Sequence, residues 1–412
     1  MALQISATNP EHPALLLELP WQLPLEKWPD RHLVPLPRGI SRHVVRYARA
    51  GDEVVAVKEL AERPALREYE LLRSLDRIGI PAVDPLAVVT GRSGDDGPLE
   101  PVLITRHLGG SIPYRSMFET TMRPATMHRL MDALAVLLVR LHLAGFAWGD
   151  CSLSNTLFRR DAGAYAAYLV DAETGELHAR LSDGQRDYDL DLARVNISGE
   201  LLDLEASGAL HPSVDPIAFG AEICRRYEGL WRELTRTSVY PAGKYHYIDR
   251  RIRRLNDLGF DVAEMQIANS SNGDTVTFVP KVVDAGHHQR QLLRLTGLDT
   301  EENQARRLLN DLESWMATQD DYGPGDARPE VLAHRWVREV FRPTVRAVPR
   351  ELRGPMDAAE LYHELLEHRW FLSERAQHDI GLDTAVEDYV TNILPRVRTG
   401  LPAPAEEAAP PP

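Results

Sequence analysis

Trp148-Gly149-Asp150-Cys151-Ser152-Leu153-Ser154-Asn155-Thr156-Leu157-Phe158 is the stretch that decides the fold. It places an Asn five residues after an Asp, and a further Asp, Asp171, follows an apolar segment at 168–170. The apolar run at 134–142 predicts a buried helix before this loop, and the glycine after that helix predicts a turn. Segments 156–158 and 168–170 predict the two strands of a hairpin. The sequence therefore predicts helix, loop, strand, turn, strand and Asp, in that order.

A second motif lies nearer the N-terminus, where segment 54–60 (VVAVKEL) predicts a strand that carries Lys58. The only lysines of the chain are Lys27, Lys58, Lys244 and Lys281, and Arg supplies nearly all other cations. Lysine is a compact point charge, whereas arginine is a wide planar fork, so a lysine in this strand indicates a narrow phosphate site. The alternative is an edge-strand lysine that reaches solvent.

The segment after this strand, 66–75 (LREYELLRSL), predicts a helix. Its apolar stripe is formed by Leu71, Leu72 and Leu75. Helical periodicity puts Glu68 on the same inward face and rotates Glu70 away from it. We therefore expect Glu68 to point into the domain and Glu70 to be solvated, with a solvated Glu68 as the alternative.

Together these segments resemble the atypical kinase superfamily that includes lipopolysaccharide (heptose and Kdo) kinases, RIO kinases and aminoglycoside phosphotransferases. The chain looks most like an uncharacterised actinobacterial family in which a lipopolysaccharide-kinase-like domain precedes a C-terminal domain of unknown function. The resemblance covers roughly the first half of the chain. The matching text is VAVKEL, REYELLRSL, GIPAVDP, LITRHLGG, LHLAGFAWGDCSLSNTLF, YLVDAE and DLDLARV.

The resemblance implies ATP and Mg²⁺ as cofactors and a role for each motif residue. Lys58 would bind the ATP phosphates, and Glu68 would hold Lys58 in position. Asp150 would orient or deprotonate the hydroxyl of the acceptor. Asn155 and Asp171 would bind Mg²⁺.

Two further nucleotide contacts are expected on weaker signals. Loop 35–43 precedes the first strand of the lobe, and Gly39 and Ser41 would let backbone N–H groups approach a phosphate. An ordinary turn before a strand is the alternative for this loop. Segment 102–108 predicts the strand and hinge between two lobes, where backbone groups from Thr105 to His107 would bind adenine.

Three departures from the kinase pattern are visible in the sequence. Trp148 replaces the His that usually stands two residues before the catalytic Asp, and Asp171-Ala172-Glu173 replaces D-F-G. The glycine-rich loop is degenerate. Glu173 would add a metal contact, and Trp148 would brace the loop in another way. Of the three aspartates at 187, 189 and 191, we predict that Asp191 supports the catalytic loop from beneath.

Composition narrows the class of protein. The net charge of −14 over 412 residues argues against a nucleic-acid or anionic-membrane binder. The two cysteines, Cys151 and Cys224, provide neither a disulfide framework nor a zinc quartet, and Cys151 is expected to be a small packed side chain. The most apolar stretch, 131–148, is interrupted by charged residues and predicts a core helix, not a membrane span. With no signal peptide evident, we expect a cytoplasmic protein.

We predict an α+β fold, namely a two-lobed protein-kinase-like fold with an additional, mainly helical C-terminal domain. The N-lobe would span 1–104, with an irregular, proline-containing lead-in to about residue 30, and the C-lobe would span 105–214. The C-terminal domain of unknown function would span 215–396 and contain a hairpin turning at Asn272-Gly273. Within it, Glu360-x-x-His363 is interpreted as a polar helix face. A Pro/Ala/Glu-rich tail, 397–412, is predicted to be disordered.

The leading functional hypothesis is an ATP- and Mg²⁺-dependent phosphotransferase acting on a hydroxyl of a small-molecule, glycan or protein acceptor. One alternative is a pseudokinase, a nucleotide-binding scaffold whose C-terminal domain binds a protein partner. The complete set of Lys58, Asp150, Asn155 and Asp171 argues against it, and the departures argue for it. The other alternative is nucleotidyl transfer on the same fold.

Overall fold

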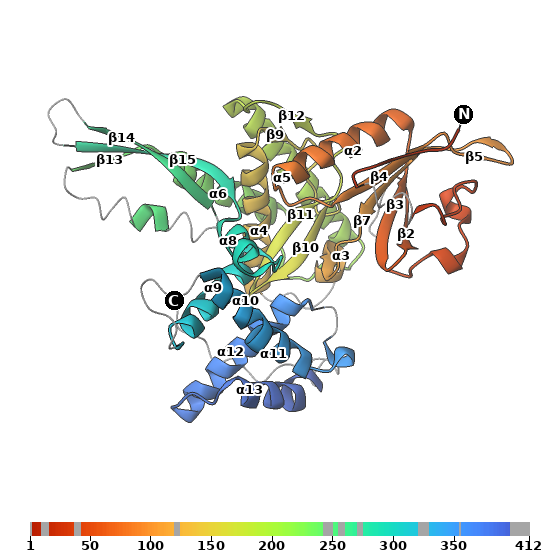
Figure 1. Ribbon diagram of the computed structural model, residues 1–412. Coiled ribbons are helices and arrows are strands. Elements are labelled where there is room, and N and C mark those ends of the chain that lie inside the picture. The colour runs from red at the N-terminus through yellow and green to blue at the C-terminus, as the bar shows by residue number, and fades with distance from the viewer. Residues whose placement is uncertain are drawn as a thin grey trace. The chain divides into compact units, whose positions relative to one another are not determined.

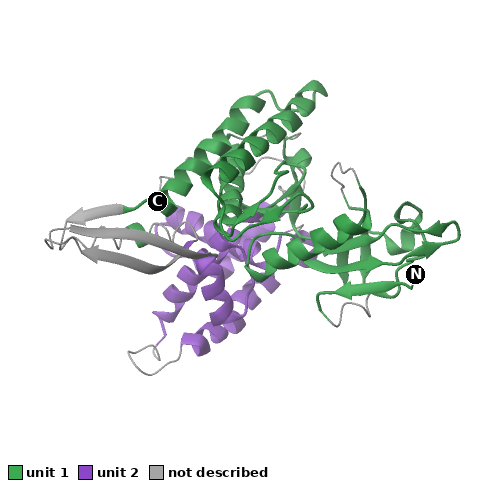
Figure 2. Cartoon of the chain, turned by 90° about the horizontal axis from the view of Figure 1, so that it is seen from above, with its two compact units in different colours: residues 1–159, 164–255, 262–285 green, residues 160–163, 256–261, 286–412 purple. Residues whose placement is uncertain are grey.

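The structure is a computed structural model that describes residues 2–9, 16–36, 43–118, 124–241, 250–253, 260–269, 275–319, 329–353 and 356–395 (Figure 1). Two compact units are present, and they are coloured separately in Figure 2. Unit 1 comprises residues 1–159, 164–255 and 262–285. Unit 2 comprises residues 160–163, 256–261 and 286–412.

Unit 1 begins with a five-stranded antiparallel sheet in the order β1-β4-β7-β3-β2. Its strands are β1 (Gln4–Ala7), β2 (Val44–Ala50), β3 (Glu53–Glu59), β4 (Pro85–Thr90) and β7 (Val102–Arg106). Side chains alternate along β3, so Val55 and Val57 are buried in a core on one face and Lys58 points to the other. Helix α2 (Glu62–Arg77) contacts β4 and β7 (Figure 1) and also reaches Lys58.

The N-terminal segment covers the face of the sheet that carries Val55 and Val57. Residues from this segment that are buried against the strands are Leu16, Leu19, Trp21, Leu25 and Trp28. Two short 3-10 turns, η1 (Leu25–Lys27) and η2 (Asp30–His32), shape the segment. The expectation of an irregular lead-in is therefore wrong for β1, which pairs with β4. It is incomplete for residues 16–28, which supply the five buried side chains named above. The physical reason is that a sheet with two apolar faces needs a cover on each.

Arg92 fixes the N-terminal segment to the sheet. Its guanidinium donates to the carbonyl oxygens of Trp21 (3.2 Å), Leu23 (2.6 Å) and Glu100 (2.5 Å). It also pairs with Glu59 on β3 at 2.7 Å, and its side chain is fully buried. Two very short paired strands, β5 (Ser93–Gly94) and β6 (Gly97–Pro98), follow Arg92.

The C-lobe part of unit 1 is built on three helices, α4 (Pro124–Leu143), α5 (Asp183–Ala206) and α6 (Pro216–Thr235), which pack on one another. Short α3 (Tyr114–Phe118) precedes them. The remaining strands are β8 (Ser111–Pro113), β9 (Phe146–Ala147), β10 (Thr156–Asp161), β11 (Ala164–Leu169) and β12 (Glu176–Leu177). Gly145 turns the chain from α4 into β9 with φ +81°, and a Cβ there would collide with the carbonyl oxygen of His178. The predicted order of helix, loop, strand, turn and strand is thus confirmed.

The boundary expected at residue 215 differs from the division seen in the structure. Helix α6 belongs to unit 1 because it packs on α4 and α5, with Tyr227 against His142 of α4. Its Phe219 also contacts Phe118 of α3. Unit 1 also contains most of a three-stranded sheet in the order β13-β15-β14. Its strands are β13 (Ser238–Pro241), β14 (Phe260–Asn269) and β15 (Thr275–Ala285). The last two are the strands predicted around Asn272-Gly273, whereas the turn itself lies outside the described residues.

The described part of unit 2 from residue 286 onwards is helical, whereas its short segments 160–163 and 256–261 include the end of β10 and the start of β14. Its elements are α8 (His287–Thr296), α9 (Glu302–Met316), α10 (Pro329–Trp336), the π-helical η3 (Val337–Phe341), α11 (Arg342–Ala347), η4 (Arg350–Leu352), α12 (Ala358–Ala376), α13 (Leu382–Asp388) and the π-helical η5 (Tyr389–Ile393). Trp336 and Tyr362 lie in its core, and both donate to the Asp311 carboxylate, at 3.0 and 2.7 Å. The predicted tail, 397–412, lies outside the described residues.

Glu360 and His363 on α12 are buried, so their interpretation as a polar helix face is wrong. Glu360 accepts hydrogen bonds from the Gln304 side chain and from the backbone N–H of Ala162, both at 2.9 Å. Residues 160–163 belong to unit 2, and Asp161 accepts backbone hydrogen bonds from the first turn of α9. A carboxylate at a helix N-terminus is stabilised by the free N–H groups and by the helix dipole. No described helix is long and apolar enough to cross a membrane.

We predict that Arg92→Ala destabilises unit 1 by about 3 to 5 kcal/mol, because it leaves Glu59 and several buried carbonyl groups without their partner. Thermal and chemical unfolding followed by circular dichroism would measure the loss. Arg49→Ala is the matched control, since Arg49 is exposed on β2 of the same sheet. Equal stability of the two variants would contradict the anchoring role.

Candidate active site

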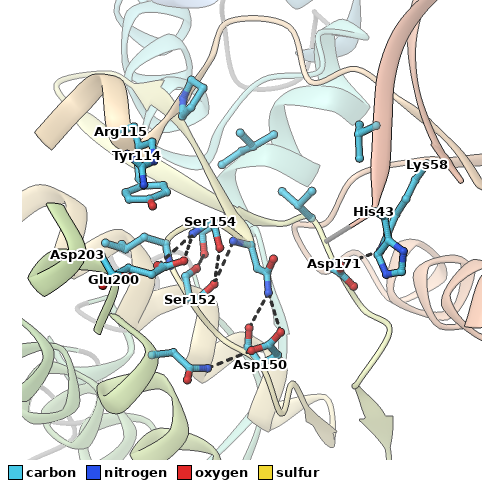
Figure 3. Close-up of a pocket in the computed structure, with 18 of the residues that line it drawn as sticks. His43, Lys58, Tyr114, Arg115, Asp150, Ser152, Ser154, Asp171, Glu200 and Asp203 are labelled. Atoms are coloured by element: carbon cyan, nitrogen blue, oxygen red, sulfur yellow. Dashed lines mark hydrogen bonds and ion pairs between the residues drawn. The ribbon is translucent and has the colours of Figure 1, made fainter. Parts of the chain in front are cut away.

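A cavity of about 920 Å³ in unit 1 contains the main residues that the sequence singled out. Lys58, Asp150, Asn155 and Asp171 all line it, although they come from segments far apart in the sequence. Figure 3 shows Lys58 and Asp171 on one side of this cavity and Glu200 and Asp203, from α5, on the other. The four predicted side chains are therefore brought into one pocket.

Lys58 is bonded to two carboxylates. Its Nζ lies 2.9 Å from Oε2 of Glu68 on α2 and 2.7 Å from Oδ2 of Asp171, which follows β11. Burial disfavours the ammonium charge, but the attraction of Glu68 and Asp171 outweighs burial and raises the pKa of Lys58. Lys58 is therefore a firmly protonated cation, and the alternative of a solvent-reaching lysine is wrong.

Glu68 has the environment that helical periodicity predicted. Its side chain is 1% exposed, whereas Glu70 is exposed and pairs with Arg73. Burial, reinforced by the nearby Asp171 charge, raises the pKa of Glu68 to about 7 despite the bond to Lys58. Ionisation of Glu68 in the folded protein therefore costs free energy near neutral pH, even though Lys58 lies beside it.

The Asp171-Ala172-Glu173 turn is held in place by its own backbone and by Trp148. Asp171 accepts a hydrogen bond from the backbone N–H of Glu173 at 3.0 Å. The buried Trp148 donates its indole N–H to the backbone oxygen of Asp171 at 2.8 Å. This contact shows how the aromatic residue that replaces the usual His braces the site. Glu173 also meets Nε2 of His43, next to β2, at 3.2 Å.

Both carboxylate oxygens of Asp150 accept hydrogen bonds from side-chain amides. Asn155 Nδ2 lies 3.1 Å from Oδ2 of Asp150 and 3.0 Å from its backbone oxygen. Asn196 Nδ2, on α5, lies 3.1 Å from Oδ1. Two amide donors from two elements fix the plane of the carboxylate. Because Asn155 uses its nitrogen here, its carbonyl oxygen is the atom that it can offer to a cation.

Helix α5 supports the whole loop through side chains on one face. Asp189 accepts the backbone N–H groups of Trp148 (2.8 Å) and Gly149 (2.7 Å) at the start of the loop. Asn196 contacts Asp150 in the middle, and Glu200 accepts the backbone N–H groups of Leu153 (2.7 Å) and Ser154 (3.2 Å) at its end. Since residues seven and eleven positions apart share a helix face, one straight helix holds three points of the loop.

The supporting aspartate is Asp189, so the prediction of Asp191 is wrong. Asp191 is exposed and pairs with Arg194 at 2.6 Å. Asp189 is buried and also contacts Nε2 of His142 at 2.9 Å. Burial opposes its charge, but the bonds from His142 and the two backbone N–H groups outweigh burial and hold the pKa of Asp189 below its ordinary value.

The donor atoms suit a hard divalent cation. Asp171 and Asn155 offer a carboxylate and a carbonyl oxygen to the same cavity, and Mg²⁺ prefers oxygen ligands. Carboxylate oxygens of Glu68, Asp171 and Glu173 all lie within 4.8 Å of one another, so Glu173 adds negative charge to this region. Asn155 and Asp171 therefore fit Mg²⁺ by their chemistry.

Four other residues were predicted to contact the nucleotide: Gly39, Ser41, Thr105 and His107. Gly39 and Ser41 lie outside the described residues. Thr105 and His107 are not among the residues that line the cavity. The backbone N–H of Arg106 donates to Asp84, and that of His107 donates to Val54, at 2.8 and 3.0 Å. These two backbone N–H groups are thus already used within the fold, and the adenine contact at Thr105 to His107 stays a prediction.

Three residues of the site escaped the sequence analysis: Asn196, Glu200 and His43. Asn196 and Glu200 lie on a helix that the sequence marks only by its start, and their roles depend on its rotation.

Cys151, next to Asp150, is fully buried, and burial raises the pKa of its thiol well above the ordinary value. It is a packed side chain, as expected.

We predict that Glu68→Gln stabilises the metal-free protein by about 1 to 3 kcal/mol at about pH 8, because it removes a buried charge. The folded pKa of Glu68 is raised to about 7, so the stability from its protonated form is complete below the unfolded pKa and is lost as pH rises through about 7. The gain of the variant should therefore shrink towards about pH 5. Unfolding curves in EDTA across this range would measure it, with Glu70→Gln as control; a gain independent of pH would contradict the assignment.

We predict that Asp189→Ala lowers the unfolding free energy by about 2 to 4 kcal/mol, because two backbone N–H groups and His142 lose a buried acceptor. Asp191→Ala, two residues along the same helix, should change it by less than about 0.5 kcal/mol because Asp191 is exposed. Urea denaturation of both variants gives the comparison. The reverse ranking would restore Asp191 as the supporting residue.

Two segments of the chain match known protein-family models. Residues 51–207 match the model of the lipopolysaccharide kinase (Kdo/WaaP) family, and residues 229–394 match a domain of unknown function, DUF4032. No curated protein matches the chain.

Among solved structures, the chain is similar to "WaaP in complex with acyl carrier protein", with 15% sequence identity and a TM-score of 0.38. The match covers 62% of this chain and 99% of that chain. The two family matches lie side by side along the sequence without overlap. This chain therefore combines a segment that matches the lipopolysaccharide kinase (Kdo/WaaP) family model with a segment that matches the DUF4032 model.

Proposed function

We propose that this chain is an ATP- and Mg²⁺-dependent phosphotransferase that acts on a hydroxyl group. The observation that carries the proposal is the bonding of Lys58 to both Glu68 and Asp171 beside a cavity that also contains Asp150 and Asn155. A buried lysine held between a helix carboxylate and a metal-binding carboxylate is suited to binding phosphates. The match to a kinase family supports the same reaction class.

Lys58 and Glu68 would act on the nucleotide. The Lys58 ammonium would bind the phosphate oxygens as a compact cation, and Glu68 would keep it extended towards the cavity. Asn155 and Asp171 are the residues that would hold Mg²⁺, which when bound would neutralise the charge that develops on the transferred phosphoryl group.

Asp150 would act on the acceptor. Asn155 and Asn196 fix its carboxylate, and Asp189 and Glu200 fix the loop on which it stands. A carboxylate held in this way can accept the hydroxyl proton as the oxygen attacks phosphorus, and most of the rate gain comes from positioning. The acceptor would be a small molecule, a glycan or a protein.

One observation favours a nucleotide-binding scaffold as the second candidate function. The Asp171 carboxylate already contacts Lys58 through Oδ2 and the backbone N–H of Glu173 through Oδ1. Mg²⁺ would have to compete with Lys58 for Oδ2. If it does not, the chain would bind nucleotide without turning it over.

Incubation with Mg²⁺ and ATP labelled on either the γ- or the α-phosphate tests the proposal. We expect γ label, and not α label, to move to water, to the chain itself or to an added acceptor. Lys58→Met and Asp150→Asn should each slow this transfer by roughly 100-fold or more, because each removes a charged group from the reacting centre. The matched control is Asp191→Asn, an exposed aspartate on α5 that should leave the rate unchanged.

A thermal-shift titration with Mg²⁺ and ATP separates the alternatives. Stabilisation by nucleotide that Asp150→Asn retains, together with γ transfer that it loses, is the expected pattern. Stabilisation without any transfer would indicate the scaffold, and transfer of α label would indicate a nucleotidyltransferase. No stabilisation in either the parent chain or Lys58→Met would refute nucleotide binding at this cavity.

A further inference from the structure

Helix α5 is apolar on two opposite faces. One face is buried in unit 1 and is formed by Ala193, Ile197, Leu201 and Leu204. The opposite face consists of Tyr188, Leu192, Val195, Gly199, Leu202 and Ala206, which we call the α5 stripe. An amphipathic helix on a protein surface normally presents a polar face there, so a second apolar face indicates a second packing partner.

Three of the four large side chains of the α5 stripe are exposed, and the fourth, Leu192, is half-buried. Tyr188, Val195 and Leu202 are 68%, 52% and 42% exposed, and they stand seven residues apart. Gly199 lies between the last two, and a Cβ built there would have open space around it. Single exposed apolar residues are ordinary, but a continuous row along a long helix marks an interaction surface.

The spacing of the α5 stripe is that of a coiled-coil seam. From Tyr188 to Ala206 the six residues follow one another in alternating steps of four and three. This repeat of 3.5 residues keeps one narrow line of side chains facing a single partner helix, which inserts its own apolar side chains between them. A flat partner or a broad groove would not require this repeat.

The stripe borders the candidate active site. Val195 and Gly199 line the same cavity as Asp150, together with their neighbours Asn196 and Asp203. A helix bound along the stripe would therefore lie next to the cavity.

Charge on both edges of the stripe selects the partner. In the heptad pattern the flanking positions include Asp203 and Glu205, both exposed, one on each edge. Asp191 is a third flanking acid, but its charge is already paired with Arg194. Flanking charges decide pairing in coiled coils, so a second copy of α5 would meet like charges, whereas a helix with Lys or Arg at these positions would meet opposite ones.

We propose that the α5 stripe is the docking site for an amphipathic helix of a partner protein, with apolar residues at the seam and basic residues at its edges. The apolar contacts provide the binding surface, and the acidic edges exclude a second copy of this chain. The inference does not depend on phosphoryl transfer, because it concerns a surface that binds whether or not the cavity is active.

Two synthetic peptides of four heptads test the proposal with the full-length chain. Both carry Leu at the seam; one carries Lys and the other Glu at the flanking positions, and both are used below the concentration at which they self-associate. Fluorescence anisotropy should show binding of the Lys peptide, weakened by added salt, and roughly tenfold or more weaker binding of the Glu peptide.

Leu202→Glu and Tyr188→Glu should each reduce binding of the Lys peptide by roughly tenfold or more, since both put a charge into the seam. Val331→Glu, an equally exposed apolar residue on α10, is the matched control and should bind as the parent does. Leu202→Ala, with a smaller expected loss, keeps the test valid if a charged variant does not fold.

Three results would overturn the proposal. These are absence of Lys-peptide binding, equal binding of both peptides, and insensitivity of binding to the Leu202 and Tyr188 variants. Sedimentation provides the other check. A dimer of the parent chain that Leu202→Glu dissociates would assign the stripe to a second copy instead.

Discussion

The ion pairs of Lys58 are the interaction on which the geometry of the candidate site depends. They join residues that are 10 and 113 positions apart in the chain, because Lys58 is on β3, Glu68 on α2 and Asp171 after β11. Buried charges are tolerated only when their partners lie in good geometry. The register of β3, the rotation of α2 and the position of the Asp171 turn must therefore all satisfy one ammonium group.

Much of this unit was predictable because its candidate site residues lie in short local patterns. The spacing of Asp150 and Asn155 and the apolar run before Asp171 are visible without knowledge of any contact, and the structure brings these residues into one cavity with Lys58. Glu68 could be chosen over Glu70 because helical periodicity alone decides which of them faces inward. The adjacent strands β14 and β15 were predicted from Asn272-Gly273, which lies between them in the sequence.

The rest depends on distant contacts that leave no local pattern. Asp189 and Asp191 differ only in which of them faces His142 and the loop backbone, so the sequence offered no basis for the correct choice. The N-terminal segment appears irregular because few of its residues form helices or strands, yet it covers a sheet face. Glu360 has a surface-like sequence context, but residues 160–163 bury it in unit 2.

Because the chain has only four lysines, labelling of Lys58 can be followed individually. Acylating reagents attack only the neutral amine, and the raised pKa of Lys58, caused by Glu68 and Asp171, keeps that form rare. Lys27 is exposed in the same lobe and serves as an internal reference for reagent strength. The ratio of acylation at these two positions, read from two peptides of a digest, would report how often the buried ion pairs are open. Mass spectrometry of the two labelled peptides would thus measure the electrostatic environment of Lys58 without any acceptor substrate.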